Sequence, residues 1–152
     1  MSRVTDRLAE LGLVLPEVPA PVAAYVPAVV SGNHVFTAGQ LPLSDGSLLA
    51  TGVVGVDVTP EQATACAHQC AVNTLAAVAS VVDLDRVVRI VKATVFVASD
   101  PSFTGQPAVA NGASELYGSV FGEAGVHARS AVGVSVLPLG APVEVELVVE
   151  IA

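Results

Sequence analysis

The fold is decided by the stretch His127-Ala128-Arg129-Ser130-Ala131-Val132-Gly133-Val134-Ser135-Val136-Leu137-Pro138, whose residues alternate with a period of two and so predict a β-strand. One face of this strand carries Ser130 and three valines, and we expect it to pack beneath helices. The other face is small and polar, with Arg129 at its start, followed by Ala131, Gly133 and Ser135.

Arg129 is one of only six Lys and Arg residues in a chain that is 53% hydrophobic. A buried charge without a partner is costly, so Arg129 on a core strand requires an anionic group. That group is either a protein carboxylate in a structural ion pair or the carboxylate of a ligand, which an Arg fork grips with two parallel hydrogen bonds. The strand alone leaves both alternatives open.

The composition limits the class of protein. A chain of 152 residues is long enough for one domain with a sizeable core, and its formal net charge of −8 argues against nucleic acid as the main partner. No apolar run reaches the roughly 18–20 residues of a membrane span. The high hydrophobic content therefore indicates surface buried between subunits. No signal peptide is evident at the N-terminus, so we expect a cytoplasmic protein.

The two cysteines, Cys66 and Cys70, lie four residues apart in a predicted helix, with His68 between them. This spacing places the two thiols on one helix face and turns His68 away from them. Two ligands are too few for a zinc site, and no second cluster completes the set. We therefore expect Cys66 and Cys70 to be small buried residues, and we expect no metal or other cofactor.

The pattern along the chain predicts helices over residues 5–13, 60–82 and 107–121 and strands over 25–30, 34–39, 53–58, 88–97, 127–138 and 143–151. Residues 1–20 form an N-terminal helical extension with a Pro-rich connector, and residues 21–152 form the main domain. The main domain has the order β-β-β-α-β-α-β-β, an α+β two-layer architecture with two helices on one face of a single sheet. The other face is expected to carry Arg129 and Glu144.

The residues that stand out for chemistry are Arg129, Glu144 and Tyr25. A Ser-His-Asp arrangement is not indicated, because the histidines fall in a hairpin, in the middle of a helix and at a strand entrance, which are structural or solvent-facing places: His34, His68 and His127. Composition and periodicity thus lead only to an anion-binding Arg near a carboxylate.

Six short segments carry a resemblance to a known family: Ala24-Tyr25-Val26-Pro27, Phe36-Thr37-Ala38-Gly39-Gln40-Leu41-Pro42, Val91-Lys92-Ala93-Thr94-Val95-Phe96-Val97, His127-Ala128-Arg129-Ser130, Leu137-Pro138 and Val143-Glu144-Val145-Glu146. From residue 21 to its end, the chain resembles the reactive intermediate deaminase family (RidA/YjgF). The resemblance implies a chorismate-mutase-like fold, a homotrimer with clefts between subunits, and hydrolysis of 2-imino or enamine acids to 2-keto acids and ammonia. It implies 2-iminopropanoate and 2-iminobutanoate as substrates, and no cofactor.

The resemblance also implies roles for single residues. Arg129 matches the residue that grips the substrate carboxylate, and Glu144 matches the acid that orients water. Tyr25 matches a cleft-wall residue from the neighbouring subunit, Asn111 matches a cleft-side Asn, and Gly39 lies on backbone near the substrate.

Two positions depart from the active deaminases: Ala38 stands where they usually have Ser, and Ala131 where they usually have Cys. Both changes remove a polar group from the cleft. The chain also has an N-terminal helix that the short type lacks, so it resembles a longer branch. The alternative function is a non-catalytic trimeric binding or sensor protein for small carboxylates such as 2-keto acids. Nucleic-acid cleavage, attached to some relatives, does not suit the −8 charge.

The geometry of the last two strands bears on the site. If they form a direct hairpin, Glu144 faces Ser135, and Arg129 then lies ~20 Å away along the strand at about 3.4 Å per residue. In that arrangement Arg129 and Glu144 serve one site only when they come from different subunits. Otherwise another strand or a bulge must separate the last two strands.

Overall fold

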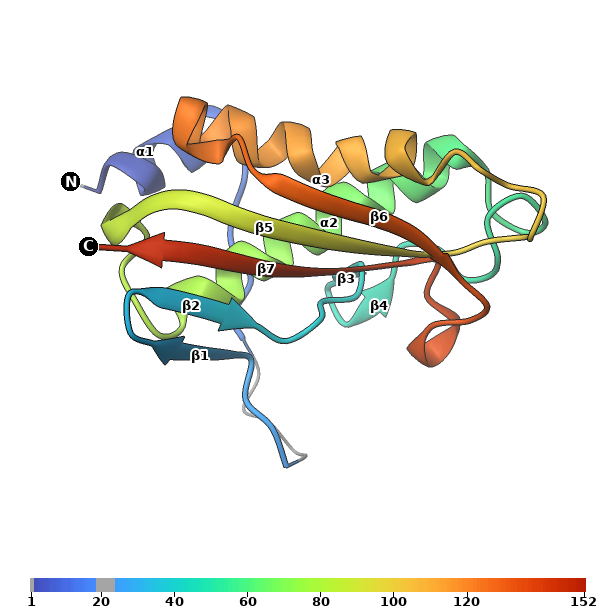
Figure 1. Ribbon diagram of the computed structural model, residues 1–152, viewed down its shortest axis with the longest axis horizontal. Coiled ribbons are helices and arrows are strands. Elements are labelled where there is room, and N and C mark those ends of the chain that lie inside the picture. Colours follow the sequence, from blue (N-terminus) through green and yellow to red (C-terminus); the bar gives the residue numbers. More distant parts are fainter. Residues whose placement is uncertain (1, 19–23) are drawn as a thin grey trace.

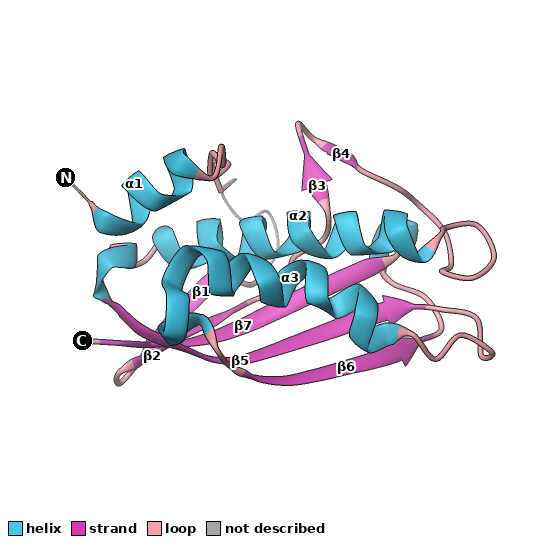
Figure 2. Cartoon of the chain, turned by 90° about the horizontal axis from the view of Figure 1, so that it is seen from above, coloured by secondary structure: helices cyan, strands magenta, loops and turns pink. Residues whose placement is uncertain are grey.

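Two layers make up the structure, a computed structural model that describes residues 2–18 and 24–152 (Figures 1 and 2). The main sheet has five strands in the order β1-β2-β7-β5-β6. Their bounds are β1 Ala28–Ser31, β2 His34–Thr37, β5 Val87–Ala98, β6 Ala128–Val134 and β7 Val143–Ile151. The helices α2 (Pro60–Ala79) and α3 (Gln106–Phe121) both lie on one face of this sheet (Figure 2). The predicted α+β two-layer fold is therefore confirmed.

The helix α2 begins where the sequence predicts and ends earlier. Thr59 and Gln62 form a capping box, with Pro60 in the first helical position. At the other end, α2 stops at Ala79 rather than near residue 82. The α2 and α3 helices approach so closely that a Cβ on Gly112 would overlap the backbone carbonyl oxygen of Thr64. This contact sets how closely the two helices of the covering layer approach each other.

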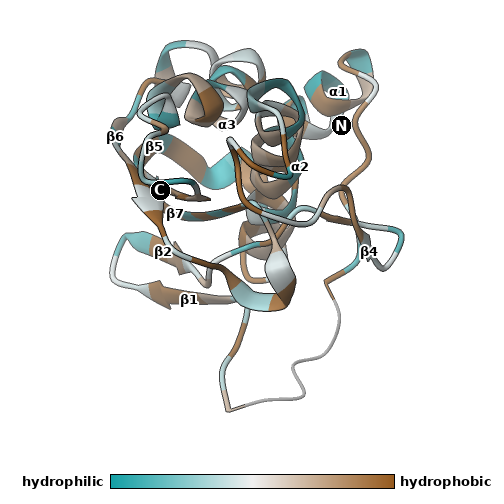
Figure 3. Ribbon diagram, turned by 90° about the vertical axis from the view of Figure 1, so that its right-hand side faces the viewer, coloured by the Kyte–Doolittle hydropathy of each residue, from teal (hydrophilic) through white to brown (hydrophobic). Residues whose placement is uncertain are grey.

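The face of the sheet under the helices is apolar. Every second residue of β7, from Val143 to Ile151, is buried, and β5 contributes Ala93, Val95 and Val97. Coloured by hydropathy, α2 and the strands beneath it show mainly hydrophobic tones (Figure 3). The alternate residues of β5 and β7 point away from the helices. Among the described residues, no helix covers this opposite face of the sheet (Figures 1 and 2). We call it the open face.

The prediction of a strand over residues 53–58 is wrong. Residues 53–58 form a tight turn in which the Asp57 carboxylate accepts a hydrogen bond from the Val53 N–H. A two-stranded hairpin precedes this turn, β3 (Leu43–Ser44) and β4 (Ser47–Leu48), closed by the Asp45-Gly46 turn. The buried Asn73 of α2 anchors the hairpin by donating to the carbonyl oxygens of Leu41 and Leu43. Local hydrogen bonds thus replace a regular strand here, and only Val54 pairs with the end of β5: its N–H donates to the Ala98 carbonyl oxygen at 2.8 Å, and its carbonyl oxygen accepts from the Asp100 N–H at 3.0 Å.

The first helix, α1 (Arg3–Glu10), begins and ends two to three residues before the predicted range and packs on the domain. The Asp85 carboxylate accepts hydrogen bonds from the backbone N–H groups of Arg3 and Val4 at the start of α1. The side chains of Val4 and Leu8 join the main core. The predicted connector prolines Pro19 and Pro21, and the predicted boundary after residue 20, lie outside the described residues.

Short 3-10 turns complete the order: η1 (Leu84–Arg86), η2 (Gly122–Gly125) and η3 (Pro138–Gly140). The strand β1 begins only at Ala28, so Tyr25 precedes it. Both cysteines are free and buried, and His68 is exposed. Within the described ranges, no helix is long and apolar enough to cross a membrane, and no group of three or more His, Cys, Asp or Glu is arranged to hold a metal ion.

The prediction for the faces of the Arg129 strand is wrong. The strand β6 runs parallel to β5, and Arg129 pairs with Ala93, a buried residue of the helix-covered face. The valine face therefore points to the open side, where Val132 is 43% exposed. The physical reason lies where the loop after β5 enters α3, since a Cβ on Gly133 would come within 2.9 Å of the side chains of Ser99, in this loop, and Gln106, the first residue of α3. Only small residues fit between the end of β6 and this loop.

The last two strands are not neighbours, because β5 lies between β6 and β7. In the two registers with β5, Arg129 is level with Ala93 and Glu144 is level with Phe96. Because paired residues share a face, Arg129 lies on the helix-covered face and Glu144 on the open face. The expectation that the open face carries both residues is correct for Glu144 and wrong for Arg129.

Candidate functional site

Arg129 lies on the outermost strand of the sheet, half-buried beside α3. Its Nη1 donates to Asn111 Oδ1 at 2.8 Å and to Ser114 Oγ at 3.2 Å. Asn111 and Ser114 are three residues apart on α3 and therefore face the same side of the helix. In the described part of the chain, no carboxylate pairs with Arg129, and its Nε and Nη2 make no hydrogen bond. Its partners are neutral, so the positive charge remains uncompensated there.

Sequence reasoning missed two residues beside Arg129. The Ser114 hydroxyl lies 2.9 Å from His127 Nε2, and His127 Nδ1 lies 2.7 Å from the carbonyl oxygen of Gly125. The structural role expected for His127 agrees with these bonds, but its connection to Arg129 through Ser114 was not foreseen. One signal was available: Ser114 follows Asn111 by three residues in a predicted helix.

A shallow hollow of about 320 Å³ opens beside these groups. It is lined by residues of α3, η2 and the start of β6: Ser114, Glu115, Gly118, Gly125, Val126, His127 and Arg129. The hollow is large enough for a small carboxylate of a few heavy atoms. Ala131, two residues beyond Arg129, is half-buried on the same face of β6 and presents only a methyl group.

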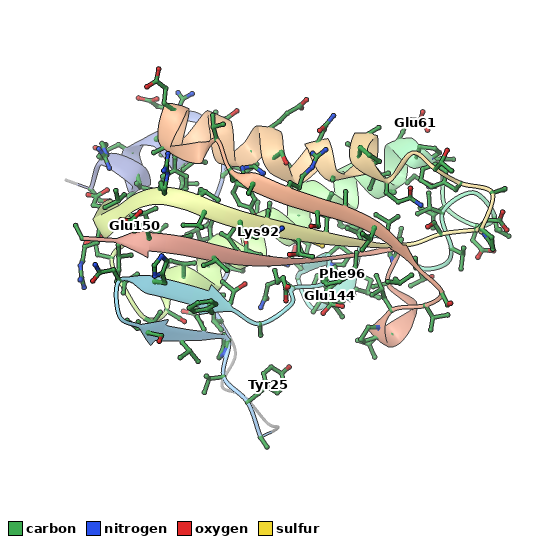
Figure 4. The ribbon with its side chains drawn as sticks, in the orientation of Figure 1. Tyr25, Glu61, Lys92, Phe96, Glu144 and Glu150 are labelled. Atoms are coloured by element: carbon green, nitrogen blue, oxygen red, sulfur yellow. The ribbon has the colours of Figure 1, made fainter. Side chains whose placement is uncertain are left out.

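Glu144 belongs to a second group of predicted site residues, on the open face. Two backbone hydrogen bonds between Gln40 and Val145, at 2.8 and 3.0 Å, bring the chain at Gly39 against β7. A Cβ on Gly39 would overlap Glu144 Oε1, so the absence of a side chain there makes room for the carboxyl group. Glu144 and Phe96 lie next to each other on this face (Figure 4).

The environment of Glu144 favours its protonated form. Partial burial raises the pKa of the Glu144 carboxyl above its ordinary value, and the nearby negative charge of Glu146 raises this pKa further. A carboxyl group with a raised pKa can donate a proton at a pH where an ordinary Glu is fully ionised.

Ala38 and Tyr25 lie on the segments leading to and from the first two strands. The Ala38 N–H donates to the carbonyl oxygen of Pro27 at 2.8 Å, and Ala38 is half-buried. Tyr25 is 64% exposed and lies on the segment before β1, away from Glu144 (Figure 4). Its ring is therefore free to contact another molecule.

The predicted site residues thus fall into two groups, whose charged members, Arg129 and Glu144, lie on opposite faces of the sheet. One group holds Arg129, Asn111 and Ala131 beside α3, and we call it the arginine group. The other holds Glu144, Gly39, Ala38 and Tyr25, and we call it the glutamate group. A single chain does not bring the two groups together, because the sheet itself separates Arg129 from Glu144.

Comparison with known proteins identifies the family to which the chain belongs. Residues 16–151 match the family model described as Endoribonuclease L-PSP. The chain therefore belongs to this family, which is also called the YjgF/RidA family.

Individual relatives support the assignment over nearly the whole chain. The chain is 49% identical to Protein TCP17 of Trypanosoma cruzi over 151 residues, which cover 98% of this chain and 94% of TCP17. Two crystal structures are similar. One is Atu1372 of Agrobacterium tumefaciens, a protein of unknown function, with a TM-score of 0.89, 45% identity and coverage of 97% of this chain and 91% of that one. The other is a putative endoribonuclease of Shewanella oneidensis MR-1, with a TM-score of 0.92, 32% identity and coverage of 97% and 99%.

Proposed function

We propose that this protein hydrolyses reactive 2-imino and enamine acids, such as 2-iminopropanoate and 2-iminobutanoate, to 2-keto acids and ammonia. Membership of the YjgF/RidA family is consistent with this activity. The observation that carries the proposal is the uncompensated positive charge of Arg129. Its guanidinium is held by the neutral groups of Asn111 and Ser114, and no carboxylate in the described ranges neutralises it. A ligand carboxylate is the partner that the charge requires.

The chemistry needs little more than positioning. The Nε–Nη2 edge of Arg129 binds the substrate carboxylate with two parallel hydrogen bonds. A water molecule adds to the C=N carbon, its proton passes to nitrogen, and the resulting carbinolamine loses ammonia to give the 2-keto acid. Glu144 as carboxylate takes the proton from the attacking water and, as carboxylic acid, passes it to the imine nitrogen. It then takes the hydroxyl proton of the carbinolamine and passes it to the amino nitrogen as the C–N bond breaks. Its raised pKa places these two forms closer in energy near neutral pH.

We further propose that the active form is a homotrimer whose clefts join two subunits. The arginine group of one subunit and the glutamate group of its neighbour then complete one site, with Tyr25 closing the cleft wall. The separation of the two groups by the sheet supports this arrangement. The open face also has exposed apolar side chains, Phe36 at 47% and Val132 at 43%, which a neighbouring subunit would cover.

A second candidate is a trimeric binding or sensor protein for 2-keto acids. The observation that favours it is the pair Ala38 and Ala131, which place methyl groups where the active deaminases usually have hydroxyl and thiol groups. A binder still requires Arg129, whereas only the enzyme requires the proton transfers of Glu144. The substitution Glu144→Gln therefore separates the two functions: it leaves affinity for pyruvate unchanged in both and abolishes turnover in the enzyme alone.

RNA cleavage is the activity that the family model's description names. The chain has six Lys and Arg against fourteen Asp and Glu, and Arg129 is flanked by Glu115 rather than by other cations. A surface of this charge repels a phosphate backbone. We therefore assign the Arg129 site to a small carboxylate.

The test generates 2-iminopropanoate in solution from alanine with an amino-acid oxidase. Semicarbazide is added, because it traps the imine in competition with hydrolysis. If the protein is a deaminase, it lowers the yield of trapped product in proportion to its concentration, and pyruvate appears instead. Arg129→Ala should lose this effect, and Arg89→Ala, at an exposed position on β5, should keep it. An unchanged yield of trapped product at micromolar protein would exclude the activity.

A further inference from the structure

A chain of three polar groups connects Arg129 to the protein interior. Arg129 Nη1 donates to Ser114 Oγ at 3.2 Å, Ser114 Oγ lies 2.9 Å from His127 Nε2, and His127 Nδ1 lies 2.7 Å from the Gly125 carbonyl oxygen. A carbonyl oxygen only accepts, so the proton of the neutral imidazole is on Nδ1 and Nε2 is an acceptor. In this tautomer Arg129 donates to Ser114, Ser114 donates to His127, and His127 donates to the Gly125 carbonyl oxygen.

The far end of this chain of polar groups is closely packed. A Cβ on Gly125 would overlap the backbone carbonyl of Tyr117, so η2 lies directly on α3. The rings of Tyr117 and His127 pack edge to face, with 5.6 Å between their centroids and an interplanar angle of 87°. Tyr117 is fully buried, and its hydroxyl is 2.7 Å from Thr74 Oγ1 of α2. His127 is thus anchored to both helices of the covering layer.

We propose that Ser114 and His127 are positioning residues that orient Arg129 for carboxylate binding. Asn111 and Ser114 engage Nη1 alone, and His127 acts through Ser114, which leaves Nε and Nη2 available to a ligand. Holding the guanidinium in advance reduces the freedom that a long side chain loses on binding. This inference rests on the proposed function, since it assumes that Arg129 receives a carboxylate. It gives a role to two residues, Ser114 and His127, to which the family resemblance assigns none.

A nucleophilic role for the same pair is less well supported by the geometry. Ser114 and His127 are at hydrogen-bond distance, as a nucleophile and its base must be. The group that orients His127 is a neutral carbonyl, however, and the imidazolium formed on proton transfer would lie one hydroxyl group away from the Arg129 guanidinium. The ionisable groups around His127 are Arg129, Tyr117 and, in the hollow, Glu115. The exposed Glu115 does not bond to His127.

The experiment measures pyruvate binding by titration calorimetry and imine turnover by the trapping assay, on the full chain. Ser114→Ala should weaken pyruvate binding about tenfold and raise KM about as much, with kcat within about twofold, because it removes one hydrogen bond to a charged group. Ser114→Thr retains the hydroxyl and should restore binding to within about twofold. Ser119→Ala on the same helix changes an exposed serine whose hydroxyl forms no hydrogen bond within the described ranges, and it serves as the matched control.

A second pair of variants tests the histidine. His127→Gln keeps an acceptor for the Ser114 hydroxyl and should bind pyruvate within a few-fold of the parent, whereas His127→Leu should bind as weakly as Ser114→Ala. Thermal unfolding of each variant reports whether the fold is retained. A normal affinity in folded Ser114→Ala and His127→Leu, with binding lost in Arg129→Ala, would overturn this inference alone. A normal affinity in Arg129→Ala would instead overturn the proposed function.

Discussion

The two faces of the main sheet are built from different residues on the same strands. Along β5 and β7, the positions facing α2 and α3 are Val, Ala, Leu and Ile, and they are almost completely buried. The alternate positions hold Glu144, Glu146, Glu150, Lys92, Thr94 and Phe96, which are partly exposed. The covered face stabilises the fold through packing. The open face carries charged groups and exposed rings that packing within one chain does not use.

The edge strand β6 reverses this division. Its small, polar side faces the helical layer, and its valine side faces outward. Because of this reversal, Arg129 lies on the edge strand and faces α3. Its guanidinium donates hydrogen bonds to Asn111 and Ser114 of that helix instead of contacting apolar groups. The covered face thus has a polar site at the edge of the sheet. There the packing under α3 ends, and the hollow beside Arg129 begins.

The largest expected effect comes from disturbing the covered layer. Gly112→Ala places a methyl group where the Thr64 carbonyl of α2 already lies, so the two helices must separate. We expect a loss of about 1–3 kcal/mol in the free energy of unfolding, the usual cost of overpacking. Gly118→Ala on the same helix meets nothing within 4 Å and should be neutral or stabilising. Chemical denaturation measures both, and equal stabilities would show that the helices tolerate separation.

The next effect concerns the open face. Phe36 on β2 is 47% exposed beside Val148, and Phe36→Asp adds a charge to the surface that we propose a neighbouring subunit covers. The variant should dissociate to folded monomers at micromolar concentration, because a buried unpaired carboxylate is costly. Light scattering reports the mass, and Ala65→Asp on the exposed side of α2 is the control. An unchanged trimer mass in Phe36→Asp would exclude this face from the interface.

A smaller effect is expected when the charge of Arg129 is kept and its shape is changed. Arg129→Lys should weaken pyruvate binding about tenfold or more, because an ammonium group cannot form the paired contact with a carboxylate. Arg89→Lys, exposed at the start of β5, should leave binding unchanged. Titration calorimetry distinguishes the two. Unchanged affinity in Arg129→Lys would show that Arg129 acts only through its charge.

The smallest effect is a pH-dependent one at Glu144. Its pKa is raised in the folded protein, mainly by burial, so the native state keeps this proton to a higher pH than the unfolded chain does. Stability therefore falls as pH rises from the ordinary Glu pKa, about 4.3, through the raised folded value. Glu144→Gln removes this dependence and should melt higher than the parent at pH 7 and equally below about pH 4. A melting difference that stayed constant over this range would contradict the assigned burial.

Several features of the fold followed from local patterns. The capping box at Thr59 and the strict alternation in residues 143–151 depend on neighbouring residues only, and both elements form where they were predicted. The strand predicted at 53–58 failed because the Asp57 carboxylate accepts from the Val53 N–H and closes a turn, so that pairing with the end of β5 is limited to a single bridge at Val54. Hydrophobic alternation alone does not reveal whether a partner strand exists.

The site was harder to predict than the fold. Alternation separated the two faces of β6 correctly, but it did not indicate which face meets the helices. The deciding contact is the close approach of Gly133 to Gln106, between residues far apart in the sequence. For the same reason, Ser114 and His127 could not be connected to Arg129, since their contacts depend on how η2 packs against α3. The residue pattern singled out Arg129 and Glu144, and the resemblance to a family assigned their roles, but neither indicated their placement on opposite faces.

The measurement that tests the central claim most directly is subunit complementation. Arg129→Ala and Glu144→Gln should each abolish imine hydrolysis in their own homotrimers. If each site takes Arg129 from one subunit and Glu144 from its neighbour, unfolding and refolding an equal mixture should restore about a quarter of the parent activity, since that share of random interfaces has both residues intact. Parent protein taken through the same procedure sets the full value. Mixed trimers that remain as inactive as the two variants, while the refolded parent is active, would contradict a site shared between subunits.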